Sequence, residues 1–178
     1  MQYLSGRVIA DDDIAALFAE TFAASEGADE GAVIRAFVAE MLATTPTPDL
    51  HVFTALDQGT PVGCILFSRL RYNDTRTVFI LSPVAVLPGH QGRGVGQGLI
   101  THGLDALRDS GVDYAITYGD PAYYARVGFA QITQDFAPAP LPLSQPIGWL
   151  GQSLSETAPA PFAGPARCVP ALNNPGLW

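Results

Sequence analysis

The spacing of apolar residues in the first half of the chain predicts one short strand followed by two amphipathic helices. Residues 4–9 are expected to form the strand. The acidic cluster 11–13 is expected to cap the first helix, and residues 25–29 are expected to form a loop before the second. The second helix should end before the Thr-Pro-Thr-Pro run at residues 45–48. The apolar stripes contain Ile14, Leu17, Phe18 and Phe22 in the first helix, and Val33, Phe37, Val38, Met41 and Leu42 in the second.

Three further apolar runs predict strands. Residues 51–56 and 62–70 are joined by Asp-Gln-Gly, which is typical of a hairpin. Residues 77–87 form the third run, and it contains Pro83. Because proline donates no hydrogen bond to a neighbouring strand, we expect a bulge there, or a strand that separates from its neighbour.

The third run leads directly into a glycine-rich turn, and residues 83–99 read PVAVLPGHQGRGVGQGL. The first backbone N–H groups of a helix have no partner inside the helix and lie at the positive end of its dipole, so such a turn favours a phosphate group. Glycine alternates with other residues at positions 92, 94, 96 and 98, which allows close approach of an anion and positive φ angles. The sequence therefore predicts a diphosphate-binding turn.

Two common phosphate-binding loops do not match this turn. The dinucleotide fingerprint requires a glycine three residues after its second glycine, where this chain has Gln97 or Leu99. The P-loop requires a lysine, and the chain has none. A nicotinamide enzyme nevertheless remains one hypothesis for this turn, and it predicts thermal stabilisation of the protein by NAD.

The second half of the chain continues the alternation of helix and strand. A helical stripe through residues 99–107 ends near Gly111, and a strand is expected at 112–118. Asp120 and Pro121 should start a short helix, before a strand at 129–132. Nine of the 15 prolines lie after residue 137, which predicts extended chain there, with candidate strands at 147–154 and 166–172.

Two motifs in the same order resemble those of the GNAT N-acetyltransferases. Gln91, Gly94 and Gly96 form Gln-x-x-Gly-x-Gly, the acyl-CoA-binding motif of that superfamily. Residues 119–129, which read GDPAYYARVGF, are similar to the GNAT segment that ends in Tyr, a short helix and Gly-Phe. The specific similarity covers about residues 80–132 and is strongest to small bacterial acetyltransferases of the YhbS type.

This resemblance implies an α/β fold with a mixed, mostly antiparallel sheet of about six to seven strands, flanked by about four helices. Two parallel strands at its centre are expected to splay apart, so that free backbone groups in one of them pair with the pantetheine arm of CoA. We expect residues 1–178 to form one acyltransferase domain. Residues 137–178 would complete the sheet or the acceptor pocket.

The implied activity is transfer of an acetyl group from acetyl-CoA to a primary amine, expected to be that of a small molecule, by direct attack in a ternary complex. By resemblance, Tyr124 is the general acid to the departing thiolate, and the Val86 backbone N–H stabilises the acetyl oxygen. Tyr123 is assigned to packing. Glu26 is a weak candidate base that a solvated loop charge explains better, and a chain of waters could serve as the base equally well. The expected cofactor-binding residues are Val84, Ala85, Val86, Gln91, Gly92, Arg93, Gly94, Val95, Gly96 and Gln97.

Composition limits the other classes of function. The net charge of −8 argues against a nucleic-acid surface, and no apolar run approaches the ~20 residues of a membrane span. We therefore expect a cytoplasmic protein without a nucleic-acid or membrane partner.

Cys64 and Cys168 lie in apolar runs, so we interpret both as reduced core residues, with no metal-ligand spacing. A homodimer stays open, and the alternative function is a CoA-binding sensor or scaffold without turnover.

Overall fold

Seven strands form one sheet in the order β1-β2-β3-β4-β5-β7-β6 in the computed structural model, which describes residues 1–178. All neighbouring strands are antiparallel except β4 and β5, the parallel pair at the centre. The expected mixed sheet with a parallel central pair is therefore confirmed. The strands are β1 Gln2–Ser5, β2 Leu50–Asp57, β3 Thr60–Leu70, β4 Val78–Val86, β5 Tyr114–Tyr118, β6 Ala130–Gln131 and β7 Trp149–Ser153.

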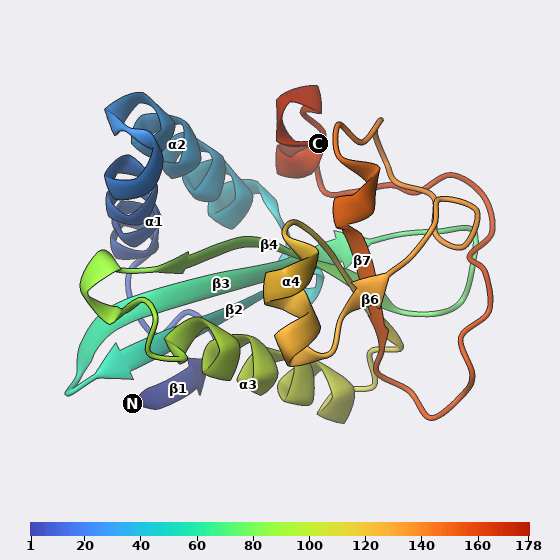
Figure 1. Cartoon of the computed structure of the whole chain (residues 1–178), viewed down its shortest axis with the longest axis horizontal. Helices are drawn as coiled ribbons and strands as arrows, with labels where there is room; N and C mark the ends of the chain where they lie inside the picture. The colour runs from blue at the N-terminus through green and yellow to red at the C-terminus, as the bar shows by residue number, and fades with distance from the viewer.

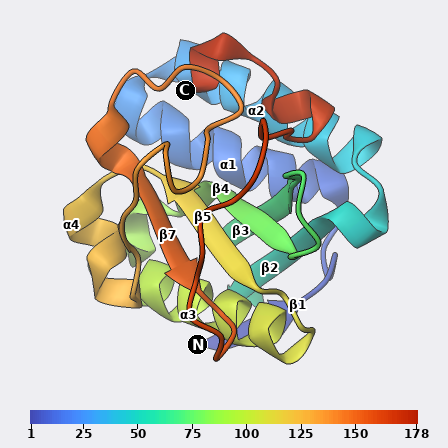
Figure 2. The ribbon, with the colours of Figure 1, turned by 90° about the vertical axis from the view of Figure 1, so that its right-hand side faces the viewer.

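Helices cover both faces of the sheet. Figure 1 shows α1 and α2 on one face, beside the C-terminal segment, and α3 on the other, while Figure 2 views these layers from the side. Six 3₁₀ turns complete the structure, and no helix is both long and apolar enough to cross a membrane. The helices are α1 Asp11–Glu26, α2 Ala28–Thr44, α3 Val95–Asp109 and α4 Pro121–Tyr124.

The alternation of side chains along β4 divides the core into two parts. Val78 and Ile80 are buried on the face covered by α1 and α2, whereas Phe79 and Leu81 are buried on the face covered by α3. Successive side chains of a strand point to opposite faces, so a run of apolar residues fits a strand covered on both sides. This placement fixes the end of β4 between the two helical layers.

The N-terminal predictions need two corrections. The first strand spans Gln2–Ser5 rather than residues 4–9, because Gly6 adopts a φ of 93° directly after it. The acidic cluster does not cap α1, whose N-cap is Ala10 and has no side-chain hydrogen bond. The three aspartates occupy the first turn, where they complement the helix dipole, and Asp11 forms an ion pair with Arg7.

The predicted loop at residues 25–29 is wrong. Helix α1 continues to Glu26, and Gly27 alone separates it from α2. Gly27 makes the sharp turn with a φ of 105°. Gly31 lets the two helices pack closely, because a Cβ there would lie 2.7 Å from the Cβ of Ala23. The one-residue connection and this glycine together allow the close contact between the two helices.

The C-terminal half mostly agrees with the predictions. Strand β7 falls within the predicted run 147–154 and inserts between β5 and β6. Residues 166–172 are not a strand, because they form only a bridge between Arg167 and Arg71 before Pro170 starts a 3₁₀ turn. Cys64 is buried as predicted, whereas Cys168 is partly exposed.

Candidate functional site

Strands β4 and β5 separate halfway along β4. Their parallel pairing runs from Val78 with Tyr114 to Leu81 with Thr117 and stops there. The opposite neighbour, β3, stays paired with β4 to Val86 through a register shift that lies across from Pro83. The bulge and the strand separation expected at this proline are both present, and together they open a gap between the two central strands.

The backbone of β4 presents alternate residues to this gap. Leu87 donates its N–H to the Val62 carbonyl of β3. Every second residue of an antiparallel ladder faces the same neighbour, so Ala85 also faces β3. Val84 and Val86 consequently turn their N–H groups toward the gap. The carbonyl of Val86 accepts a hydrogen bond of 2.8 Å from the Gln91 side chain, which ties the end of β4 to the following turn.

The turn between β4 and α3 leaves a row of backbone donors free. The N–H groups of His90 and Gln91 donate to carbonyls within the preceding 3₁₀ turn, and that of Gly98 donates to the carbonyl of Gly94. Between them, the consecutive N–H groups from Gly92 to Gln97 have no acceptor in the protein. A row of unpaired donors at the N-terminus of a helix of this length is suited to bind an anion.

The four alternating glycines serve two different purposes. Gly92 and Gly94 have φ angles of 70° and 78°, and Gly94 is the N-cap of α3 in the left-handed conformation. Gly96 and Gly98 do not leave open space. A Cβ at Gly96 would overlap the hydroxyl of Tyr123, and one at Gly98 would overlap the hydroxyl of Tyr3. Only the first two therefore shape the turn through positive φ angles, while the others allow tyrosines to pack on α3.

A cavity of about 630 Å³ lies between the turn, the end of β4, α1 and α4. Its wall contains most of the residues that the sequence suggested for cofactor binding, together with four that the sequence did not suggest. The suggested residues in the wall are Val84, Val86, Gln91, Gly92, Gly94, Val95, Gly96 and Gln97, and the additional ones are Thr21, His90, Tyr123 and Arg126.

Two of the four additional residues share a spacing in the sequence, although this spacing does not say what they face. Tyr123 and Arg126 are three residues apart, a spacing that places both on one face of a helix, so they line the cavity together. Thr21 is a polar residue beside the apolar stripe of α1, and its hydroxyl donates 2.9 Å to the Leu17 carbonyl. His90 faces Asp57, with 3.4 Å between its Nε2 and the carboxylate. The assignment of Tyr123 to packing alone misses its exposure to the cavity.

Tyr124 lies beside the cavity, at the end of the strand pairing, and is not part of the wall. Its ring packs on Gly119, where a Cβ would come within 2.7 Å of it, and lies edge-on to Tyr123 and Phe129. Burial, partly offset by the neighbouring Thr117 hydroxyl, raises the pKa of Tyr124 to about 12. The phenol therefore remains protonated throughout the neutral range.

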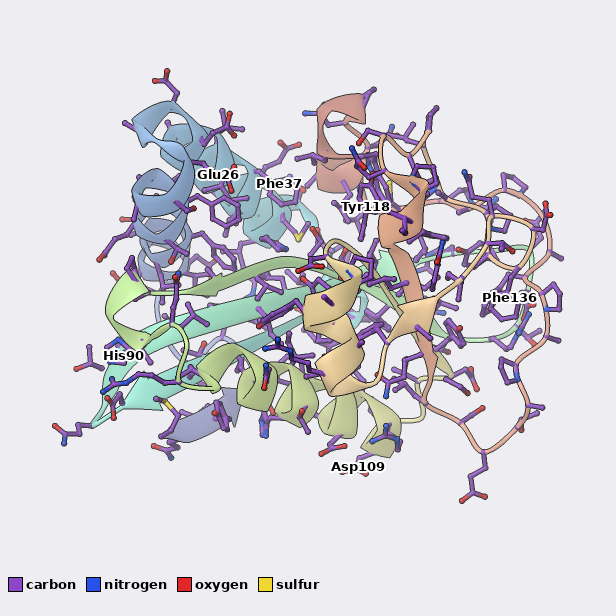
Figure 3. All side chains as sticks on the ribbon, in the orientation of Figure 1. Glu26, Phe37, His90, Asp109, Tyr118 and Phe136 are labelled. Carbon is purple, nitrogen blue, oxygen red and sulfur yellow. The ribbon has the colours of Figure 1, made fainter.

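Three other suggested residues lie outside the cavity wall. Ala85 is buried in the core between the sheet and helices α1 and α2. Arg93 is exposed on the turn, with no ion pair. Glu26 is exposed at the end of α1, and Figure 3 shows it with helices α1 and α2, while His90 marks the turn after β4. The cavity wall itself contains no carboxylate.

Comparison of the fold gives two similar structures with bound cofactor. One is the GNAT family N-acetyltransferase YhbS of Escherichia coli in complex with CoA, with a TM-score of 0.74, 24% identity, and coverage of 97% of this chain and 92% of that one. The other is a GNAT family acetyltransferase of Brucella melitensis in complex with acetyl-CoA, with a TM-score of 0.70 and 23% identity, covering 97% of each chain. At these identities the similarity shows a common fold.

Sequence comparison shows the family. The chain is 37% identical over 118 residues to the uncharacterized N-acetyltransferase YjhQ of E. coli K12. The matched residues make up 63% of this chain and 65% of that relative. It is 34% identical over 74 residues to YhbS of the same strain, covering 41% and 44% of the two chains. Each match thus spans less than two thirds of the relative. Residues 12–129 match the sequence profile of the acetyltransferase (GNAT) family, and the chain belongs to this family.

Proposed function

We propose that the protein transfers an acetyl group from acetyl-CoA to a primary amine of a small molecule, by direct attack within a ternary complex. The row of free N–H groups from Gly92 to Gln97 carries this proposal, because it leads into the gap beside Val84 and Val86. The similar structures of YhbS and the Brucella enzyme hold CoA and acetyl-CoA. The family membership of this chain agrees with the same chemistry.

The residues of the cavity fit each part of this cosubstrate. The free amides of the turn bind the diphosphate, since they offer several donors at the positive end of α3. The main chain at Val84 and Val86 faces the gap, where it pairs with the amides of the pantetheine arm. The Val86 N–H then lies where a donor stabilises the acetyl oxygen as negative charge develops on it. Acetyl-CoA itself supplies an acetyl group activated as a thioester.

Tyr124 assists the departure of the thiolate. With a pKa of about 12, complete transfer of its proton to a thiolate of pKa ~8.5 would cost about 5 kcal/mol, against about 2 kcal/mol for an unperturbed phenol. Burial therefore favours donation of a hydrogen bond to the developing thiolate over complete transfer before the bond breaks. Its edge-on contacts with Tyr123 and Phe129 hold the ring in place for this role.

Replacing Tyr124 by Phe is expected to lower kcat about 30-fold and to leave the KM for acetyl-CoA nearly unchanged, because the hydroxyl acts on the leaving group. The raised pKa means that ionisation of Tyr124 causes no loss of activity between pH 7 and about 10. Steady-state kinetics across this pH range measure both effects. Tyr123→Phe is the matched control, and an equal loss of kcat in both variants would contradict the assignment.

The amine must lose a proton before it attacks. No carboxylate lines the cavity, and Glu26 is exposed outside it. We propose that solvent water accepts the proton of the small-molecule acceptor. The whole chain acts as one acyltransferase domain in this proposal, since the sheet includes β7 from the proline-rich segment. We place the reaction in the cytoplasm, because a polyanionic cosubstrate does not cross an apolar bilayer.

The proposal is tested by incubating the protein with acetyl-CoA and a panel of amines, comprising polyamines, amino acids, aminoglycosides and peptides with free N-termini. Release of free thiol is followed with a chromogenic disulfide, and the acetylated product is identified by mass spectrometry. We expect amine-dependent release with at least one small molecule. Binding of CoA without turnover across the panel would support a sensor, and stabilisation by NAD alone would support a nicotinamide enzyme.

A further inference from the structure

The cavity contains one permanent positive charge without a partner. Arg126 lines the wall, and no acidic side chain pairs with it. His90, the other basic residue of the wall, has Asp57 beside it. The chain carries a net charge of −8, so acidic residues outnumber basic ones, and an arginine that faces a cavity without an acidic partner is unexpected. It provides a full charge where the amides of the turn provide only partial ones.

Arg126 lies next to the anion-binding turn. It belongs to the 3₁₀ segment Ala125–Val127, which directly follows α4 and packs against α3. Its charge is close enough to the phenol of Tyr123 to oppose the rise in pKa that burial causes there. The Tyr123 hydroxyl in turn contacts the main chain of Gly96 in the first turn of α3. The exposed Arg126 guanidinium therefore stands at the rim of the cavity beside this turn.

CoA carries two separate anionic groups, the diphosphate and the 3′-phosphate on its ribose. In the proposed function, which this inference requires, the amides of residues 92–97 bind the diphosphate and the thioester end enters the gap. The nucleotide end then extends from the turn toward solvent, where Arg126 is exposed. We infer that Arg126 binds the 3′-phosphate and makes the site select CoA over dephospho-CoA. A guanidinium suits this group because it donates two parallel hydrogen bonds to a phosphate.

The test measures dissociation constants of CoA and dephospho-CoA by isothermal titration calorimetry with the full chain. The wild-type protein is expected to bind CoA about tenfold more tightly than dephospho-CoA, the contribution of one charge-assisted contact at an exposed site. The measured quantity is the ratio of the dissociation constant of dephospho-CoA to that of CoA. In Arg126→Gln this ratio falls to about one, because CoA binds more weakly and dephospho-CoA is unaffected. Arg126→Lys keeps the charge and retains part of the ratio. Added salt lowers the ratio in the wild-type protein.

Two matched variants remove the same charge elsewhere. Arg108→Gln acts at the other end of α3, where Arg108 pairs with Asp105, and it should keep the full ratio. Arg93→Gln removes the exposed arginine of the turn. The inference is overturned if Arg126→Gln keeps the wild-type ratio while melting normally, or if Arg93→Gln abolishes the ratio instead. A wild-type protein that binds neither nucleotide refutes the proposed function itself.

Discussion

Replacing Gly94 by Val is expected to weaken CoA binding about 100-fold, the largest effect on affinity that a single residue of the turn offers. Gly94 is the N-cap of α3 with a φ of 78°, a conformation that a β-branched residue adopts only with strain. Relief of this strain rotates the peptide groups around it, and the free N–H groups then no longer converge on one anion. Calorimetric titration of CoA into the purified variant measures the change.

The control for Gly94 lies at the other end of the same helix. Gly111 has a φ of 82° and, like Gly94, has open space around its missing Cβ. Gly111→Val therefore introduces a comparable strain far from the turn, and it should lower the melting temperature while leaving the affinity for CoA within about twofold of the wild type. If both variants lose affinity equally, the amides of the turn are not the anion-binding site.

Replacing Val86 by Pro is expected to lower kcat about 100-fold, the effect of removing one donor from an oxyanion site. Proline at this position deletes the N–H that faces the gap. It removes no hydrogen bond to β3, because the ladder there uses Ala85 and Leu87. The variant should remain folded and bind CoA with an affinity that changes far less than kcat. Steady-state kinetics with an acceptor amine and calorimetry with CoA separate these quantities.

Ala85→Pro provides the contrast, since it removes a ladder hydrogen bond to β3 and inserts a ring into the core. We expect it to unfold or to melt far below the wild type, whereas Val86→Pro melts close to it. A Val86→Pro protein with full kcat would show that the N–H of this residue takes no part in the reaction. Similar melting of the two proline variants would contradict the direction of the main chain at the end of β4.

The central elements could be predicted from the sequence because local signals determined them. Asp120 accepts a hydrogen bond from the Ala122 N–H and Pro121 occupies the first helical position, as the local rules for helix starts require. The hairpin turn at Gln58 and Gly59 has positive φ at both residues. The junction of α1 and α2 was missed because it depends on contact between the two helices. Gly31 of α2 permits close packing against α1, and the residues next to Gly31 in the sequence do not indicate which segment packs there.

The candidate site was predictable in its main chain and less so in its side chains. A run of glycines before a helix marks free amides directly, and the structure places them in a cavity. The direction of a side chain depends on elements far away in the sequence. Tyr123 contacts Gly96, and Arg126 faces a cavity whose other walls come from α1 and β4. Neither contact is implied by the adjacent residues alone.

The position of β7 has a consequence for synthesis on the ribosome. β7 occupies the sheet between β5 and β6, although both of those strands precede it along the chain. When β5 and β6 have left the exit tunnel, the free side of β5 has no neighbour, and an unpaired apolar strand invites association with other nascent chains. Chaperone binding is therefore expected to be strongest in the interval before residues 149–153 emerge, and to fall once they pair.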